Sequence, residues 1–198
     1  MKSIVYIKGC NMPQIDKKEV LRYAGVKQAD EEILSLLERM EKETKGILSY
    51  KVAYRRYPIN IDGDSLDLGF AKTNSHSLAI CLKECDEIIV FCATVGVELD
   101  RLIKRYSLTS PASAVMLQAL GSERVEALCD RFCAYMAEET GRELRPRFSP
   151  GYGDLSLEIQ RDIFAAVDPM KIGVSLGENL FMTPSKSVTA IIGIKKEI

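Results

Sequence analysis

The sequence predicts one α+β domain in which helices flank a mixed, largely antiparallel sheet. Three observations support this fold class: amphipathic helical periodicity near residues 16–40 and 96–139, a continuous apolar run at 87–92, and a stretch rich in β-branched residues at 187–194. The chain has 198 residues, 46% of them hydrophobic, which is ample for one compact core and marginal for two. Without repeats or a long linker, residues 1–198 are expected to form a single domain.

The N-terminal part, residues 1–46, is expected to be helical. Asp16 begins a short helix that ends before Gly25, and Asp30 is a good N-cap for a longer one. One face of this second helix is apolar, with Ile33, Leu36, Leu37 and Met40.

Strands follow in the middle of the chain. Residues 48–57, stopped by Pro58, read as a first strand, and a second short strand is expected near residues 66–70. Residues 75–85 then form a helix. The apolar run EIIVFC at 87–92 indicates a central strand that is covered on both faces.

Helices dominate the next part of the sequence. A helix over residues 96–106 is expected to bury Leu99, Leu102, Ile103 and Tyr106. Ser110 and Pro111 make a suitable cap and first turn for a long helix that reaches about Glu139 and ends at Gly141.

The C-terminal third returns to sheet. Asp154 is positioned to cap a helix that runs through Val167, and strands are expected at residues 172–176 and 187–194.

Composition excludes several classes of function. The net charge is −1 and no basic tail or stripe is present, so nucleic-acid binding is not expected. No apolar run approaches the roughly 20 residues that span a bilayer, and the first residues lack the apolar core of a secretory signal. We therefore expect a cytoplasmic protein without a membrane anchor.

Cysteine and histidine usage argues against a metal centre. The six cysteines suit reduced cytoplasmic thiols: Cys10, Cys81, Cys85, Cys92, Cys129 and Cys133. Two pairs spaced by four on predicted helices could place two thiolates on one metal, but their apolar neighbours favour buried, uncharged thiols. His76, the one histidine, stands at a helix start, where a capping or surface role is expected. No metal site is predicted.

The segment from 145 to 154 has the composition of a small-molecule site. Prolines stiffen it, while Gly151 and Gly153 allow backbone conformations that side chains forbid. Arg147 can bind a carboxylate or phosphate through two donors, and Tyr152 offers a flat apolar face ending in a hydroxyl. This combination suits an amino-acid-bearing or nucleotide ligand. A purely structural turn is the alternative, with Arg147 paired to a local carboxylate such as Asp154 and with Tyr152 in the core.

Two motifs resemble the activation (reactivation) domain of cobalamin-dependent methionine synthase. The segment Arg147-Phe-Ser-Pro-Gly151-Tyr152 is similar to its R-x-x-x-G-Y signature. Residues 178–189, ENLFMTPSKSVT, are similar to its E-S-x-x-M-x-P-x-x-S-V-S segment. The resemblance is strongest over residues 110–194, and it implies the same α+β fold.

The resemblance implies a specific function. In that family the domain binds S-adenosylmethionine beside a cobalamin carried elsewhere, so that cob(II)alamin, reduced by a flavodoxin-type donor, is remethylated. By matching position, Arg147 would hold the ligand carboxylate, Gly151 would admit the ligand to the backbone, and Tyr152 would line the place where methyl transfer occurs. Glu126 would match a family glutamate that approaches the ligand. The cobalamin would be carried by a partner, a methionine synthase or related corrinoid protein, since this sequence lacks the D-x-H-x-x-G motif.

The sequence also departs from the family. The family continues G-Y-P-A-C-P, whereas this chain continues Gly151-Tyr152-Gly153-Asp154, and it has no tryptophan to accompany a ligand-binding aspartate. Two alternatives therefore stay open: a module that docks on a corrinoid protein without binding S-adenosylmethionine, and an unrelated small-molecule enzyme using Asp154 or Glu158 near Arg147 as acid or base.

Overall fold

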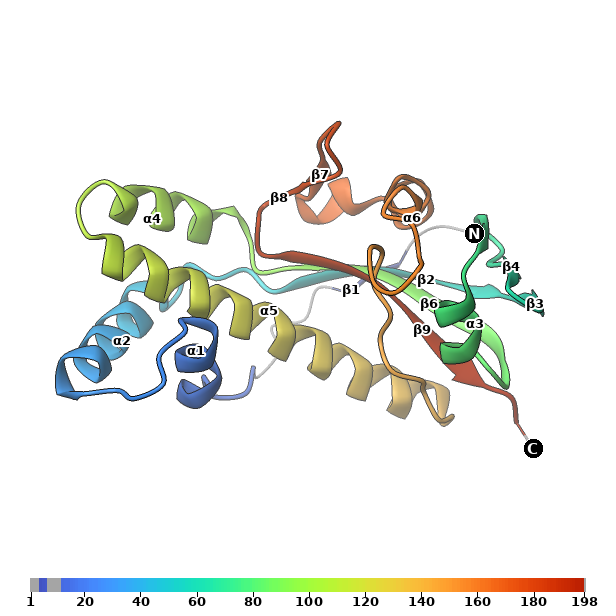
Figure 1. The fold of residues 1–198 in the computed structure, drawn as a ribbon, viewed down its shortest axis with the longest axis horizontal. Coiled ribbons are helices and arrows are strands. Elements are labelled where there is room, and N and C mark those ends of the chain that lie inside the picture. The colour runs from blue at the N-terminus through green and yellow to red at the C-terminus, as the bar shows by residue number, and fades with distance from the viewer. Residues whose placement is uncertain (1–3, 7–11, 198) are drawn as a thin grey trace.

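A four-stranded antiparallel sheet forms the centre of the molecule (Figure 1). The computed structural model describes residues 4–6 and 12–197, so Cys10 lies outside the described residues. The strand order is β1-β2-β6-β9, with bounds Ile4–Tyr6, Lys51–Pro58, Cys85–Thr94 and Ser187–Lys195. All pairings in the described part of the chain are antiparallel, which confirms the predicted fold class.

The predicted central strand is confirmed as β6. It pairs with β2 on one side and β9 on the other, and both of its faces are covered. Because neighbouring side chains point to opposite faces, Phe91 belongs to one core and Val90 to the other. An apolar run without alternation is therefore what this position requires.

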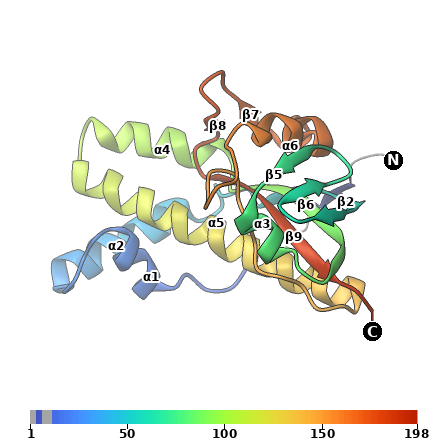
Figure 2. The same cartoon turned by 45° about the vertical axis from the view of Figure 1, so that its right-hand side comes forward.

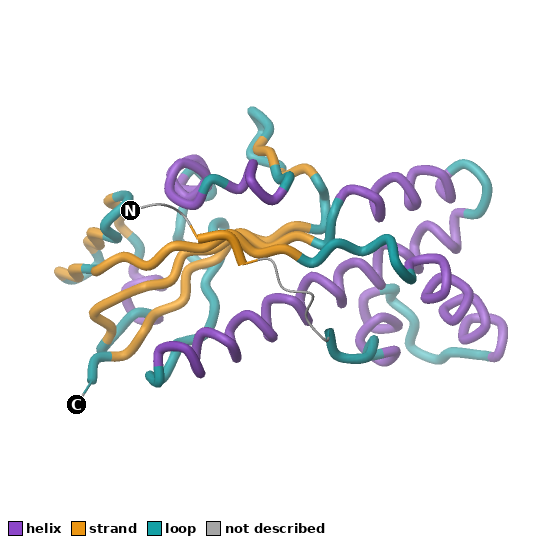
Figure 3. Tube along the Cα trace, turned by 180° about the vertical axis from the view of Figure 1, so that it is seen from behind, coloured by secondary structure: helices purple, strands orange, loops and turns teal. Residues whose placement is uncertain are grey.

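A helix of 30 residues, α5 (Pro111–Thr140), crosses one face of the sheet (Figure 3). Phe132 of α5 packs on Phe91 and on Tyr54 of β2, with ring centroids 5.0 and 5.2 Å apart. Pro111 is at the first turn, and Gly141 ends the helix with a left-handed φ of 64°. Both boundaries agree with the sequence prediction.

The other face of the sheet is covered by α6 (Ile159–Val167), α3 (His76–Cys81) and a short 3-10 helix, Pro169–Ile172. A small sheet of β3 (Asn60–Asp62), β4 (Ser65–Asp67) and β5 (Lys72–Asn74) extends this layer, as Figure 2 shows. Two short strands that precede β9, β7 (Ser175–Leu176) and β8 (Met182–Thr183), form a separate hairpin beside α6.

Three more helices surround the N-terminal half of α5. They are α1 (Lys17–Tyr23), α2 (Glu31–Thr44) and α4 (Val97–Ser107), and they share one core with α5. Asp16 and Asp30 cap α1 and α2 through their side chains, as the sequence predicts. Within the described residues, no helix is long and apolar enough to cross a membrane.

Several predictions about elements are wrong. The N-terminal part, residues 1–46, is not helical throughout, because Ile4–Tyr6 forms strand β1 of the central sheet. The helix expected at 75–85 ends at Cys81, because Glu84 takes a left-handed φ of 67° and Cys85 already belongs to β6. The strand expected at 172–176 shrinks to Ser175–Leu176, since Pro169 begins a 3-10 helix that continues to Ile172. Such boundaries depend on packing that local sequence does not encode.

Asp154 does not cap the helix that follows it; it caps α3. Its carboxylate accepts hydrogen bonds from the Ser75 hydroxyl at 2.6 Å and from the backbone N–H groups of His76 and Ser77 at 2.8 and 3.1 Å. These bonds stabilise the ionised form, led by the Ser75 bond, and hold the pKa of Asp154 far below its usual range. The α6 helix begins instead at Ile159 without a side-chain cap.

We expect Asp154→Asn to lower the unfolding free energy at pH 7, because an amide has one acceptor oxygen and no charge for three donors. The pKa is 3.8 in the unfolded reference and lower in the folded chain. The carboxylate therefore contributes its stabilisation above pH 3.8 and loses it as the pH falls below that value. Urea unfolding should show a difference between the two proteins at pH 7 that shrinks at pH 3. Asp62→Asn, at an exposed β3 position, is the control; equal behaviour of both variants would contradict the assignment.

Candidate functional site

The segment that carries Arg147 lies alongside β9. Phe148 and Ile191 exchange two backbone hydrogen bonds of 2.9 and 2.8 Å, and the N–H of Arg145 donates to the carbonyl of Gly193. Side chains alternate along an extended segment, so Phe148 enters the core beneath α6 while Arg147 points toward α5. Extended pairing with β9 therefore fixes which side chain faces the helix.

Arg147 forms ion pairs with two carboxylates one helical turn apart on α5. Its Nη2 lies 3.0 Å from Glu126 and 2.9 Å from Asp130. Its Nη1 is buried and has no hydrogen-bond partner among the described residues. An unpaired buried donor is unfavourable, so the two ion pairs leave part of the hydrogen-bonding capacity of this guanidinium unused. Arg147 is therefore paired with carboxylates, as the structural alternative expects, but its partners are on α5 and Asp154 is not one of them.

A tight turn presents Tyr152 to solvent. The Tyr152 N–H donates to Ser149 and the Gly151 N–H to Leu155, at 3.2 and 3.0 Å. Gly151 has a φ of 84°, which explains why glycine is present there. Tyr152 is 70% exposed, so its alternative placement in the core is wrong.

Three of the four predicted site residues meet in one pocket. It has a volume of about 240 Å³ and is lined by Glu126, Arg147, Phe148, Ser149, Tyr152 and Val188. Glu126 comes from α5, Arg147 from the segment beside β9, and Tyr152 from the turn. Gly151 does not line the pocket; it shapes the turn that presents Tyr152.

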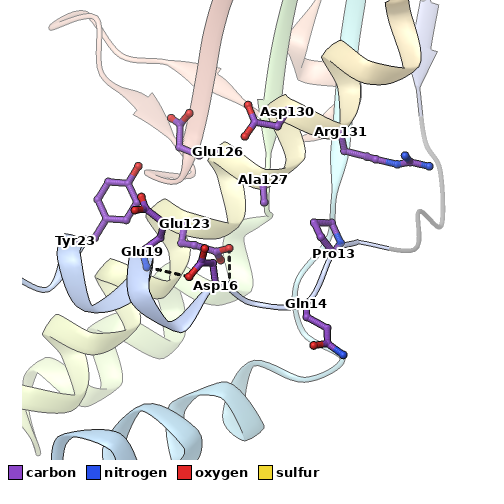
Figure 4. A pocket seen from close by; sticks show the side chains of 10 residues that line it. All are labelled: Pro13, Gln14, Asp16, Glu19, Tyr23, Glu123, Glu126, Ala127, Asp130 and Arg131. Carbon is purple, nitrogen blue, oxygen red and sulfur yellow. Dashed lines mark hydrogen bonds between the residues drawn. The ribbon is translucent and has the colours of Figure 1, made fainter. Parts of the chain in front are cut away.

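A larger, acidic pocket adjoins the first on the other side of Glu126. It has a volume of about 520 Å³, and Figure 4 shows its ten lining residues. Five are carboxylates, against one arginine: Asp16, Glu19, Glu123, Glu126 and Asp130. Because Glu126 lines both pockets and Asp130 of the larger one binds Arg147, the two hollows are neighbours along α5, and together they are called the groove below.

Sequence reasoning missed the acidic part of the groove. The backbone N–H of Asp16 donates a hydrogen bond of 3.2 Å to the Glu123 carboxylate, although the two residues are 107 positions apart in sequence. Spacing alone could not bring them together. The one available signal was Glu126, which the resemblance had placed near a ligand.

The remaining candidates for acid–base chemistry have other roles. A carboxylate whose pKa is as low as that of Asp154 is a weak base, and its bonds are used to cap α3. Glu158 pairs with Arg161 at 3.1 Å. His76 is exposed, begins α3, and lies 2.8 Å from Asp64, as expected for a capping or surface residue.

The cysteines near Arg147 are poor nucleophiles. Burial raises the pKa of Cys133 to about 11, with the positive charge of Arg147 only partly opposing the effect. Cys129 is fully buried, and its pKa is raised further for the same reason. Cys85 lies on β6 instead of sharing a helix with Cys81. In the described part of the chain, no three His, Cys, Asp or Glu side chains are grouped so as to hold a metal.

Comparison with known proteins supports the fold. No protein-family model and no curated protein sequence matches this chain. Among solved structures, a match is the crystal structure of the MetH reactivation domain bound to AdoHcy. The TM-score is 0.68 at 14% sequence identity, and the match covers 97% of this chain and 78% of the other. This protein therefore has the fold of the MetH reactivation domain.

Proposed function

We propose that this protein binds S-adenosylmethionine in the groove along α5 and supports the reductive remethylation of a cobalamin carried by a partner protein. In this proposal residues 1–198 act as one activation-domain-like unit. The observation that carries it is the meeting of Arg147, Glu126 and Tyr152 at one pocket, on a fold shared with a domain crystallised with AdoHcy.

The charges of the site suit the amino-acid end of this ligand. Arg147 is already paired with Glu126 and Asp130, so a ligand carboxylate must replace them. An α-amino acid brings its own ammonium, which can bind the released carboxylates while its carboxylate binds the guanidinium. Every charge then keeps a partner.

The same charges argue against a phosphate ligand. A phosphate would bind Arg147 but leave Glu126 and Asp130 unpaired beside added negative charge. The adjoining pocket, with five carboxylates, favours positive charge as well. Of the two ligand classes that the sequence suggested, the amino-acid-bearing one therefore fits better, and S-adenosylmethionine adds a cationic sulfonium.

Tyr152 is the best candidate for a role in methyl transfer. It stands at the edge of the smaller pocket with 70% of its surface exposed, accessible to a docked partner. Cobalamin, reduced by one electron from a flavodoxin-type donor, would supply the cobalt that accepts the methyl group, leaving S-adenosylhomocysteine. Positioning of the two reactants suffices for such a transfer, so no nucleophile of this chain is required.

A docking module without S-adenosylmethionine binding is the second candidate. The observation that favours it is the intact set of ion pairs on Arg147, together with the altered sequence after Tyr152. It predicts that the protein binds a corrinoid partner but not the ligand.

Arg147→Ala should weaken the binding of S-adenosylhomocysteine by about 1.5–3 kcal/mol, the range for a hydrogen bond to a charged group. Titration calorimetry measures the affinity, with the exposed α2 variant Arg39→Ala as the control. Equal affinity of the Arg147 variant would mean that the carboxylate binds elsewhere. No binding by the wild-type protein would favour the docking module.

Glu126→Gln tests the exchange of charges. We expect weaker binding of zwitterionic S-adenosylhomocysteine but tighter binding of acetate, which needs only Arg147. Asp130→Asn is the matched control and should have a smaller effect, because the Asp130 side chain is 74% exposed and that of Glu126 only 43%. Competition titrations separate the two ligands; a parallel change for both would count against the exchange.

Tyr152→Phe should leave S-adenosylmethionine affinity nearly unchanged and alter the rate of cobalamin methylation. The rate is followed in the visible spectrum of a corrinoid partner, with flavodoxin or a chemical reductant present. His76→Ala and Cys133→Ala should keep the wild-type rate, since neither side chain takes part. Loss of methylation in a correctly folded Cys133→Ala protein would refute transfer by positioning alone.

A further inference from the structure

The wall of the acidic pocket opposite α5 is formed by a separate part of the chain. Residues 13–16 and α1 supply Pro13, Gln14, Asp16, Glu19 and Tyr23 to the pocket lining, as Figure 4 shows. Residues 13–16 lie in the chain between β1, which ends at Tyr6, and α1, and their side of the pocket is completed by contacts with α5.

Two consecutive residues of α5 provide the polar contacts. Arg124 donates from Nη1 to the carbonyl of Pro13 at 2.8 Å and from Nη2 to that of Gln14 at 3.2 Å. Glu123 accepts from the backbone N–H of Asp16 at 3.2 Å. The two side chains also bind each other through two hydrogen bonds, although neighbouring helix positions normally point in different directions.

Burial makes this pair sensitive to loss of either member. Arg124 is 2% exposed and Glu123 5%, so each charge depends on the other and on the segment in place of water, and Arg124 also interacts with the Tyr50 hydroxyl. The bond to Asp16 then extends the effect, because the Asp16 carboxylate caps α1 at the N–H groups of Lys18 and Glu19. The pair is thus linked to the first turn of α1 through Asp16.

Residues 13–16 also border a further pocket, on the side away from the acidic one. A second pocket, of about 510 Å³, includes Ile15, Arg124 and Tyr50 in its lining, whereas the acidic pocket includes Pro13, Asp16 and Glu123. Residues 13–16 therefore lie between two hollows, and within this segment Ile15 packs against the core shared by α1, α2, α4 and α5. Polar bonds to Glu123 and Arg124 add to this apolar packing and to that of buried Val20 of α1.

We propose that Arg124 is a positioning residue for ligand binding: through Glu123 and Asp16 it holds the α1 wall of the groove, and a ligand in the groove stabilises the docked wall in return. This inference rests on the proposed function for the identity of the ligand. The free energy by which docking of the α1 wall strengthens ligand binding must equal the free energy by which the bound ligand stabilises the docked wall, because coupling between two binding events is reciprocal.

Hydrogen exchange and calorimetry together test the proposal on the full chain. In Arg124→Met, amides of residues 13–23 should exchange faster than in wild type without ligand, while β6 and β9 keep their protection. Affinity for S-adenosylhomocysteine should fall by about 5-fold or more, within the usual range of coupling between sites. In wild type, the ligand should slow exchange in residues 13–23, and this effect should be lost in the variant.

Two further variants guard against simple unfolding. Arg124→Lys keeps the charge but lacks the planar fork, so it should retain the fold and reproduce a smaller loss of affinity. Glu123→Gln with Arg124→Met removes both buried charges, which should restore overall stability but not the slow exchange of residues 13–23. Arg39→Ala should match wild type.

The outcomes separate this proposal from the proposed function. Faster exchange of residues 13–23 with unchanged ligand affinity would show that the pair only stabilises the fold, and unchanged exchange would show that it does not hold the wall; either result overturns the inference. If wild type does not bind S-adenosylhomocysteine at all, the proposed function and the coupling both fail.

Discussion

The packing of α5 against β2, β6 and β9 is the interaction on which the other features depend. Phe132 sits between Tyr54 and Phe91 in a fully apolar contact, which fixes the rotation of the helix about its axis. With that face buried, the turns bearing Glu126 and Asp130 must face the segment that runs beside β9. The same helix thus contributes to the core on one face of the sheet and carries acidic residues of the groove.

In the proposed function, the ion pairs of Arg147 would make the groove selective for a ligand that carries both charges. A guanidinium that is already paired with two carboxylates attracts a further anion only weakly. A simple anion can therefore bind it only by displacing those carboxylates. A ligand that carries both charges can exchange partners without leaving any group unpaired. This is a physical reason for an amino-acid head group to bind here, and it does not depend on the resemblance to a known domain.

Much of the fold could be predicted where the signal is local. The caps Asp16 and Asp30, the αL glycine at 141 and the apolar run of β6 each act within a few residues, and the structure confirms them. The role of Asp154 could not be predicted, because its donors lie 77–79 positions away. Likewise, the motif at 147–152 indicated half of the groove, whereas its acidic half depends on how α1 docks on α5.

A crystal structure of the protein with S-adenosylhomocysteine is the most direct test of the exchange of charges at Arg147. The account predicts the ligand carboxylate on the Arg147 guanidinium, the ligand ammonium within hydrogen-bond distance of Glu126 or Asp130, and the two original ion pairs broken. A ligand bound with both Arg147 pairs intact, or with its ammonium away from α5, would contradict it.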